Sequence, residues 1–326
     1  MNTFGNKLRV TVFGESHGEQ IGVVLDGVPP GIALAADDFT ADLDRRRSGA
    51  RGTTSRRESD TPHIVAGLYN GHTTGAPLAI TFANDDTRSG DYASLEQHPR
   101  PSHADFAAQN KFNGFNDPRG GGHFSGRLTL SLVAAGVVAK KILAQKPGGI
   151  AITSEIKSIG GSSDPAKFQS IIEAAMTDGD SVGGVVECTA TGVPAGLGEP
   201  FFDSVESVAG HLLFSIPAVK GVEFGNGFAA AALRGSENND PIISPDGRTT
   251  TNNAGGIVGG ITNGNPIVLR VAIKPTPSIS RPQQTLSLGT GRVETLTIKG
   301  RHDACIALRT PVVVKAALAI ALVQFV

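Results

Sequence analysis

Short apolar runs, bounded by glycine, proline and polar residues, recur along the chain and are typical of β-strands. Other stretches have the wider apolar spacing that is typical of helices. On the first pattern we expect strands over Leu8–Phe13, Gly22–Leu25, Leu78–Phe82, Ser181–Val186, Ile267–Ile273 and Leu296–Ile298.

Apolar residues four positions apart predict a helix over Asp37–Arg47, which Asp37 or Asp38 can cap. The arginines at 45–47 suit the negative end of its dipole. Ser48–Ser59 has no apolar period and is predicted to be a loop, whereas Arg127–Lys146 predicts a second, longer helix.

Two apolar stretches fall short of the roughly 20 residues that a membrane span needs. Leu128–Ala139 is too short, and Pro311–Val326 contains Lys315, so we expect two buried helices and no membrane contact. The N-terminus lacks the order of a signal peptide, and Cys188 and Cys305 form no disulfide framework. A reduced, cytoplasmic location follows as an expectation.

Strands and long helices are mixed without strict alternation, which predicts an α+β fold with one fused domain over residues 1–326. A weak internal echo links the segment from Gly18 to Ile32 with the segment from Gly179 to Leu197. Asn70-Gly71 and Asn263-Gly264 also each lead into a Pro-containing strand start. Either two superimposable halves or a chance recurrence of turn residues explains the echo.

Six arginines lie between Arg45 and Arg57, followed closely by the carboxylates Glu58 and Asp60. A solvated face is the ordinary explanation of such a run. Because this run lies in a glycine-containing loop, we favour a site for phosphate or carboxylate. Nucleic-acid binding is not expected, because the net charge is only −1 and aromatic side chains that could stack on bases are scarce, with no Trp and two Tyr.

Glycine-rich loops are further candidates for binding an anion. Arg119–Arg127 contains three successive glycines and precedes the long helix, whose start Ser125 can cap. Asn252–Gly260 is a second such region, and it fits a flavin or nucleotide site and a tight structural turn equally well. Neither has the spacing of a P-loop or a dinucleotide fingerprint.

Three of the eight histidines, His17, His103 and His302, lie beside glycine, proline or charged residues, and histidine titrates near neutral pH. Each is a candidate acid or base, although a lone histidine is usually structural. Asp303 is a candidate base or a partner of Arg301. Metal ligation is not expected, because no HxxxH or CxxC spacing is present.

Together these segments resemble the chorismate synthase family over nearly the whole chain. Their order and spacing are specific, although each motif alone is weak. The motifs are FGESHG at Phe13–Gly18, DGVPPG at Asp26–Gly31, DLDRRRSG at Asp42–Gly49, RPSHAD at Arg100–Asp105, DPRGGG at Asp117–Gly122, TGVPAGLGEP from Thr191, KGVEFGNGF from Lys220, NNAGGIVGG at Asn252–Gly260, KPTPS at Lys274–Ser278 and GRHD at Gly300–Asp303.

The resemblance implies helices sandwiched between antiparallel sheets and a homotetramer. It implies anti-1,4 elimination of phosphate from 5-enolpyruvylshikimate 3-phosphate to give chorismate, with reduced FMN (FMNH2). NADPH would enter only indirectly, as the source of an external flavin reductant.

The family's site residues carry over onto matching positions. By this resemblance His17 protonates the leaving phosphate, His103 protonates the reduced flavin near N1, and Asp303 relays a proton through flavin N5. Matching substrate-binding positions are Ser16, Arg46, Arg51, Arg100, Ser125, Arg127 and Arg301. Matching FMN-binding positions are His123, Phe124, Ser125, Pro217, Ala218, Gly259, Lys274, Pro275, Thr276, Pro277, Ser278 and Arg301.

The chain departs from the common family pattern near these positions. Ser102 replaces a glycine, His123–Thr129 replaces the usual run RSSARET, and Pro217 stands where Asn is common. These changes affect expected flavin contacts and leave His17 and His103 intact. Two rival functions remain: a non-catalytic flavin or phosphometabolite binder, and an RNA-binding protein that uses the arginine loop.

Overall fold

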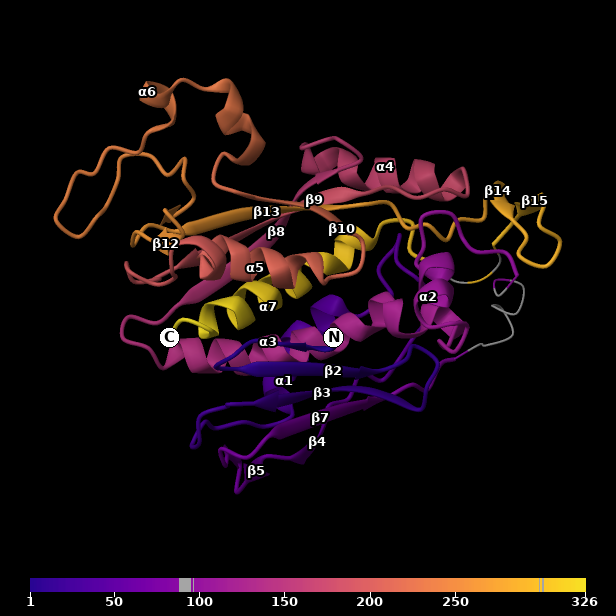
Figure 1. Ribbon diagram of the computed structural model, residues 1–326, viewed down its shortest axis with the longest axis horizontal. Coiled ribbons are helices and arrows are strands. Elements are labelled where there is room, and N and C mark those ends of the chain that lie inside the picture. The colour runs from indigo at the N-terminus through magenta and orange to yellow at the C-terminus, as the bar shows by residue number, and fades with distance from the viewer. Residues whose placement is uncertain (88–94, 96, 299, 301) are drawn as a thin grey trace.

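Two antiparallel sheets form outer layers of the fold, with helices between them (Figure 1). The computed structural model describes residues 1–87, 95, 97–298, 300 and 302–326. In spatial order the first sheet contains β1 (Thr3–Phe4), β2 (Arg9–Gly14), β3 (Gln20–Asp26), β7 (Leu78–Ala83) and β4 (His63–Ala66). The second contains β10 (Val219–Phe224), β13 (Ile267–Ile273), β9 (Gly184–Thr191) and β8 (Ala151–Ile159). This arrangement confirms the expected α+β sandwich.

The remaining described elements are helices, short 3₁₀ segments and three small hairpins. The α-helices are α1 (Asp37–Arg46), α2 (Asp105–Lys111), α3 (Thr129–Ala144), α4 (Pro165–Thr177), α5 (Val205–Phe214), α6 (Gly235–Asn238) and α7 (Thr310–Val323). The 3₁₀ segments are Arg119–Phe124, Gly126–Leu128, Phe201–Asp203, Gly227–Ala232 and Ile306–Arg309. The hairpins pair β5 (Leu68–Tyr69) with β6 (His72–Thr73), β11 (Ile257–Val258) with β12 (Ile261–Thr262), and β14 (Gln283–Leu286) with β15 (Val293–Leu296).

Most of the predicted elements exist, with some errors at their ends. The strand expected at Ser181–Val186 begins at Gly184 instead, because Gly183 and the residues before it lie in the connection to α4. The strand expected at Leu296–Ile298 is instead β15, which ends at Leu296. Ala36 occupies the N-cap position of α1, so neither Asp37 nor Asp38 caps it as expected. Asp38 instead accepts a hydrogen bond from the Ala35 backbone N–H at 2.8 Å.

The two sheets repeat one topology, which favours duplication over chance turn chemistry. In the first sheet β2, β3, β7 and β4 are neighbours in that order, and in the second β8, β9, β13 and β10 are. The two sheets also share their strand register. Leu25 of β3 pairs with Leu78 of β7, and at the equivalent position of the second sheet Ala190 of β9 pairs with Ile267 of β13. A helix, α1 or α5, follows the second strand of each set along the chain.

A buried threonine makes the same contacts in each half. In the first half, Thr73 Oγ1 donates to Pro29 O at 2.7 Å and accepts from Ile32 N at 2.9 Å. The Thr73 carbonyl also accepts from Gly31 N at 2.8 Å. This threonine therefore ties a small hairpin to the Gly-Val-Pro turn that follows β3.

Thr262 repeats that set in the second half. Its Oγ1 donates to Pro194 O at 2.7 Å and accepts from Leu197 N at 2.9 Å. Its carbonyl accepts from Gly196 N at 2.8 Å. The sequence echo is therefore a structural repeat.

The predicted correspondence between Asn70-Gly71 and Asn263-Gly264 is wrong in its register. Asn70-Gly71 forms the turn between β5 and β6, and its structural counterpart is the turn Gly259-Gly260 between β11 and β12. Gly264 follows the second hairpin, as Gly75 follows the first. Similar turn residues at neighbouring positions misled the sequence comparison.

The central helices α3 and α7 pack closely against each other between the sheets (Figure 1). A single buried apolar cluster includes residues of both sheets and of these helices, which supports our proposal of one domain. Ile306–Val323 is apolar and long enough to cross a membrane by composition alone, but 78% of it is buried inside the protein. Lys315 in this segment donates to Asp42 at 2.9 Å, so its charge is compensated within the core.

The crossing of α3 and α7 requires a glycine. A Cβ added at Gly136 would lie 2.3 Å from Ala316 Cβ and 2.6 Å from Ala316 Cα. Real atoms cannot approach so closely, so the backbones would have to separate. Gly136 therefore sets the distance between the two central helices.

We predict that Gly136→Ala lowers the free energy of unfolding by about 1–3 kcal/mol, the usual cost of overpacking a core. Gly210→Ala in α5 is the matched control, because a Cβ there meets nothing within 4 Å. The control should be neutral or more stable by up to about 1 kcal/mol, since alanine favours helix. Urea denaturation measures both, and equal effects would contradict the packing argument.

Candidate active site

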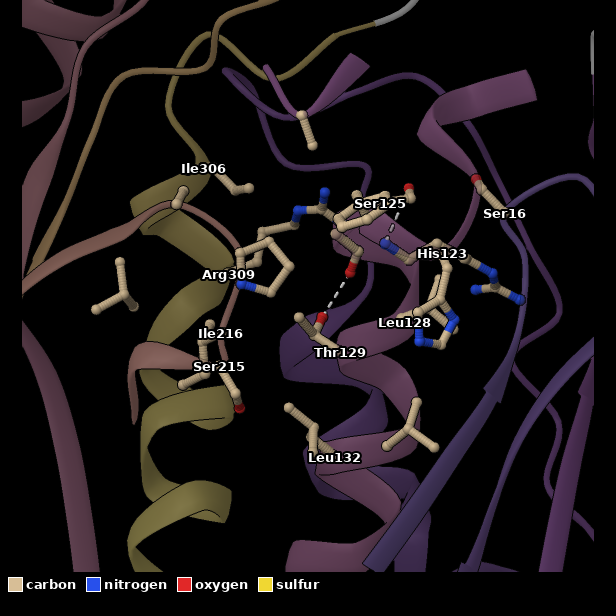
Figure 2. Close-up of a pocket in the computed structure, with 18 of the residues that line it drawn as sticks. Ser16, His123, Ser125, Leu128, Thr129, Leu132, Ser215, Ile216, Ile306 and Arg309 are labelled. Carbon is tan, nitrogen blue, oxygen red and sulfur yellow. Dashed lines mark hydrogen bonds between the residues drawn. The ribbon is translucent and has the colours of Figure 1, made fainter. Parts of the chain in front are cut away.

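A cavity of about 670 Å³ lies where α3 and α7 begin. Figure 2 shows Thr129 and Arg309 at the starts of these helices, facing the same space. Helix N-termini carry positive potential and unpaired N–H groups, which favour a bound anion. The paired helices thus direct two positive ends toward one cavity.

Most predicted site residues line this cavity, although they come from seven separate segments. They are Ser16, Arg46, Arg100, His103, His123, Phe124, Ser125, Arg127, Pro217, Ala218, Lys274, Thr276, Pro277, Ser278 and Asp303. The chain therefore gathers the arginine loop, the histidine loops and the KPTPS segment at one place.

Several predicted residues are not brought to the cavity. Arg51 is exposed and pairs with Glu173 of α4 at 3.0 Å, because its loop turns toward that helix. Gly259 lies in the β11–β12 turn, and neither Gly259 nor Pro275 lines the cavity. Arg301 lies outside the described residues.

His17 is buried directly behind the cavity wall, next to the lining residue Ser16. A Cβ on Gly120 would lie 2.5 Å from His17 Cδ2, so only a glycine lets the backbone approach the imidazole this closely. Burial lowers the pKa of His17 below its ordinary 6.5, and the cations Arg56 and Arg119 lower it further. A bound anion near His17 would raise its pKa again, because it would oppose the charges of Arg56 and Arg119.

His103 lines the cavity from the loop before α2. Burial lowers its pKa below 6.5, Asp105 opposes this shift, and Arg100 and Lys274 reinforce it. A Cβ on Gly121 would lie 3.3 Å from His103 Nε2. The two predicted catalytic histidines therefore contact consecutive glycines.

Gly120, Gly121 and Gly122 all have left-handed backbone, with φ of 61°, 82° and 53°. Such a run is accessible only to glycine without strain. Gly122 O accepts from Ser16 N at 3.1 Å, which fixes the Ser16–His17 turn against this loop. The sequence predicted that these glycines approach an anion; in the structure Gly120 and Gly121 lie against the two histidines, and Gly122 lies against Asp117.

The cation cluster is centred on two buried carboxylates. Arg127 donates to Asp60, Arg46 lies 3.7 Å from Asp60, and Arg309 donates to Asp303 at 2.8 Å. The pKa of Arg46 is lowered to about 9. Burial is the main cause, the charges of Arg309 and Arg127 lower the pKa further, and the carboxylates of Asp60 and Asp303 oppose the shift. A bound anion would oppose the effect of the two neighbouring guanidinium groups and stabilise the charged form of Arg46.

Arg56 and Arg309 also line the cavity, although neither was among the site residues assigned from the sequence; Arg56 was included only as part of the arginine run. Arg56 donates to Ser16 Oγ and Ser16 O, both at 2.9 Å, and its Nε donates to Glu58 at 2.8 Å. Its place in the arginine run was a usable signal. Arg309 immediately precedes the apolar α7, and a cation at the N-terminus of a buried helix was a signal too.

The other flank of the cavity is apolar. Its wall includes Leu128, Leu132, Leu212, Ile216 and Val219, which suit a planar aromatic ring. Near this wall, the buried Oγ1 of Thr276 has no hydrogen-bond partner among the described residues. A buried hydroxyl without a partner is expected to bind a ligand or water.

Within the described ranges, no group of three or more His, Cys, Asp or Glu side chains has the arrangement of a metal site. Cys188 and Cys305 are buried and unbonded. Burial raises their pKa values to about 12 and about 11, which keeps both thiols protonated and unreactive.

Known proteins share this sequence and fold. A chorismate synthase of Chitinophaga pinensis is 58% identical over 325 residues, covering 100% of this chain and 96% of that protein. The chorismate synthase of Korarchaeum cryptofilum is 46% identical over 343 residues, covering 97% of this chain and 94% of the relative. A crystal structure of chorismate synthase superimposes with a TM-score of 0.76 at 29% identity, covering 98% of this chain and 92% of that one.

The family model described as chorismate synthase matches residues 8–326. The agreement of a whole-length family match, close relatives and a shared fold identifies this chain as a member of the chorismate synthase family.

Proposed function

We propose that this chain is a lyase that converts 5-enolpyruvylshikimate 3-phosphate to chorismate and phosphate. The observation that carries the proposal is the excess of cations around one cavity. Its described lining contains seven such side chains: Arg46, Arg56, Arg100, Arg127, Lys220, Lys274 and Arg309. Three lining carboxylates, Glu58, Asp60 and Asp303, only partly balance them. A substrate with a phosphate and two carboxylates fits this charge.

The three proposed proton-carrying groups come from different segments, and two of them, His103 and Asp303, line the cavity. His17 is behind Ser16, His103 comes from the loop before α2, and Asp303 precedes α7. Asp303 accepts from Thr54 N at 3.0 Å and from Arg309 Nη2 at 2.8 Å, which holds its carboxylate in place. We propose that His17 gives a proton to the leaving phosphate oxygen and that Asp303 relays the proton lost from substrate carbon C6.

We propose that the apolar flank holds reduced FMN. Thr276 offers its unpartnered hydroxyl, and the segments His123–Ser125, Pro217-Ala218 and Lys274–Ser278 border the same space. The chemistry that reduced FMN supplies when bound is transient donation of electron density to the substrate. Within this site His103 would hold a proton at its imidazole, and Leu128 and Ile216 would exclude water.

We further propose a cytoplasmic homotetramer that receives its reduced flavin from an external reductant, with NADPH as the indirect electron source. The enzyme would act in aromatic amino-acid biosynthesis. The alternative is a non-catalytic flavin or phosphometabolite binder with the same cavity.

The proposal is tested by anaerobic incubation of the protein with the enolpyruvyl ester, FMN and dithionite. We expect chorismate and inorganic phosphate in equal amounts, measured by chromatography and by phosphate assay. Omitting dithionite should abolish both products. His103→Ala should lower kcat by roughly 10²–10⁴-fold while the protein stays folded, because a positioned acid contributes about that much. Folded wild-type protein that binds FMN but forms no chorismate would establish the alternative.

The pH dependence of kcat/KM and of kcat should report different pKa values of His17, in the free enzyme and in the substrate complex respectively. The pKa of His17 is lowered by burial and cations in the ligand-free protein, so kcat/KM should fall as pH rises through that lowered value. Bound anionic substrate raises the pKa again, so kcat should persist to higher pH. Anaerobic rates measured across about pH 5 to 9 give the pH at which kcat and kcat/KM each fall. If kcat falls at the same pH as kcat/KM or at a lower one, this assignment is contradicted.

Arg56→Ala should raise KM for the ester about tenfold or more, since a charge-assisted hydrogen bond contributes about 1.5–3 kcal/mol. Its matched control is Arg57→Ala, because Arg57 is the next residue, is exposed and does not line the cavity. Steady-state kinetics under reducing conditions give KM for both variants. Similar KM values in both would show that Arg56 does not bind the ester.

A further inference from the structure

The carboxylate of Asp105 lies between Arg100 and His103 and contacts both. Asp105 Oδ2 accepts from Arg100 N at 3.0 Å and from Nε at 2.7 Å, and Oδ1 accepts from Nη2 at 2.7 Å. The same Oδ1 lies 2.5 Å from His103 Nδ1. The Asp105 side chain is 14% exposed, so solvent screens these contacts weakly. It does not itself line the main cavity.

These contacts determine which nitrogen of His103 carries the proton. Arg100 Nη2 also lies 3.0 Å from His103 Nδ1, but a guanidinium can only donate. If Nδ1 accepted that bond, its lone pair would face the Asp105 oxygen at 2.5 Å. Nδ1–H donating to Asp105 removes this repulsion. The neutral ring then has its lone pair at Nε2, which is where a transferable proton would be gained or lost.

The loop that carries His103 needs such an anchor. Ser102 has a φ of 59°, a left-handed conformation that a non-glycine residue rarely adopts. Lys274 Nζ donates to Ser102 O at 2.6 Å, and Arg100 Nη1 donates to Ser278 Oγ at 3.0 Å. These two contacts connect the loop to the KPTPS segment. Asp105 adds the contact that orients the imidazole itself.

We propose that Asp105 is the positioning residue of this site, fixing both the Nδ1–H tautomer of His103 and the orientation of the Arg100 guanidinium. The tautomer follows from the geometry alone, whereas its consequence for turnover rests on the proposed function. Asp105 acts through His103 and Arg100 and does not touch the reacting atoms.

The charges that face His103 agree with this role. They are Asp105, Arg100 and Lys274. Burial opposes ionisation of Asp105, but its hydrogen bonds from Arg100 and His103 hold the pKa of that carboxyl well below 3.8. It therefore stays ionised throughout the working range. Burial lowers the pKa of His103 and the two cations lower it further, so Asp105 alone supports its protonated form.

The test is a long-range ¹H–¹⁵N spectrum of full-length protein labelled with ¹⁵N-histidine, with His103→Gln used to assign the signal. At neutral pH the wild type should show His103 protonated at Nδ1 and unprotonated at Nε2. Asp105→Asn should lose this preference and lower the pKa of His103. It should also lower kcat by about 10–100-fold, the usual effect of removing a group that orients a functional histidine.

The control is Asp164→Asn, the same change at the N-cap of α4, where Asn caps as well as Asp. It should leave the tautomer, the pKa and turnover unchanged. An Nε2–H tautomer in the wild type overturns the proposal even if Asp105→Asn does not fold. An unchanged tautomer and pKa in folded Asp105→Asn overturn it as well. The spectrum needs no turnover, so a failure of the proposed reaction would be recognised separately.

Discussion

The packing of two helices that begin at the same cavity is the constraint on which this structure depends. Gly136 lets α3 approach Ala316 of α7, and both helices begin beside Arg309 and Thr129. Their dipoles therefore add at one end instead of cancelling. The arginines increase the same positive potential. Burial and the neighbouring cations Arg309 and Arg127 lower the pKa of Arg46, and the buried carboxylates Asp60 and Asp303 oppose this shift.

A second constraint joins the histidine loops to this pair of helices. The glycines at 120–122 have positive φ and precede α3, so they bring backbone close to His17 and His103 at once. A Cβ at Gly120 would lie 2.5 Å from His17 Cδ2, and a Cβ at Gly121 would lie 3.2 Å from His103 Cε1, so a side chain at either position would press on an imidazole. In a site where small displacements reduce rates steeply, such contacts matter more than their small contribution to stability. The glycine run therefore separates the two histidines that we propose carry protons.

Sequence patterns predicted the buried framework better than the site. Ile267–Ile273 and the two apolar helices were correct because burial selects apolar residues with a regular period. Arg51 and Arg56 lie in one loop with the same chemistry, yet one meets Glu173 and the other Ser16. Such a difference depends on tertiary contacts that no local pattern records. The β15 strand was misplaced for a related reason, since its short apolar run gives no reliable end.

The repeat explains why the scaffold is symmetric while the chemistry is not. Thr73 and Thr262 make equivalent contacts, so both halves retain the hairpin and turn that support their central strands. The connections differ: β2 and β3 are joined by the short turn that contains His17, whereas β8 and β9 are joined through α4. A turn exposes few backbone groups and accommodates a reactive side chain beside the cavity. The longer connection instead supplies Glu173, which pairs with Arg51 outside the cavity. Chemical asymmetry therefore arises in the connections, where changes cost the shared core little.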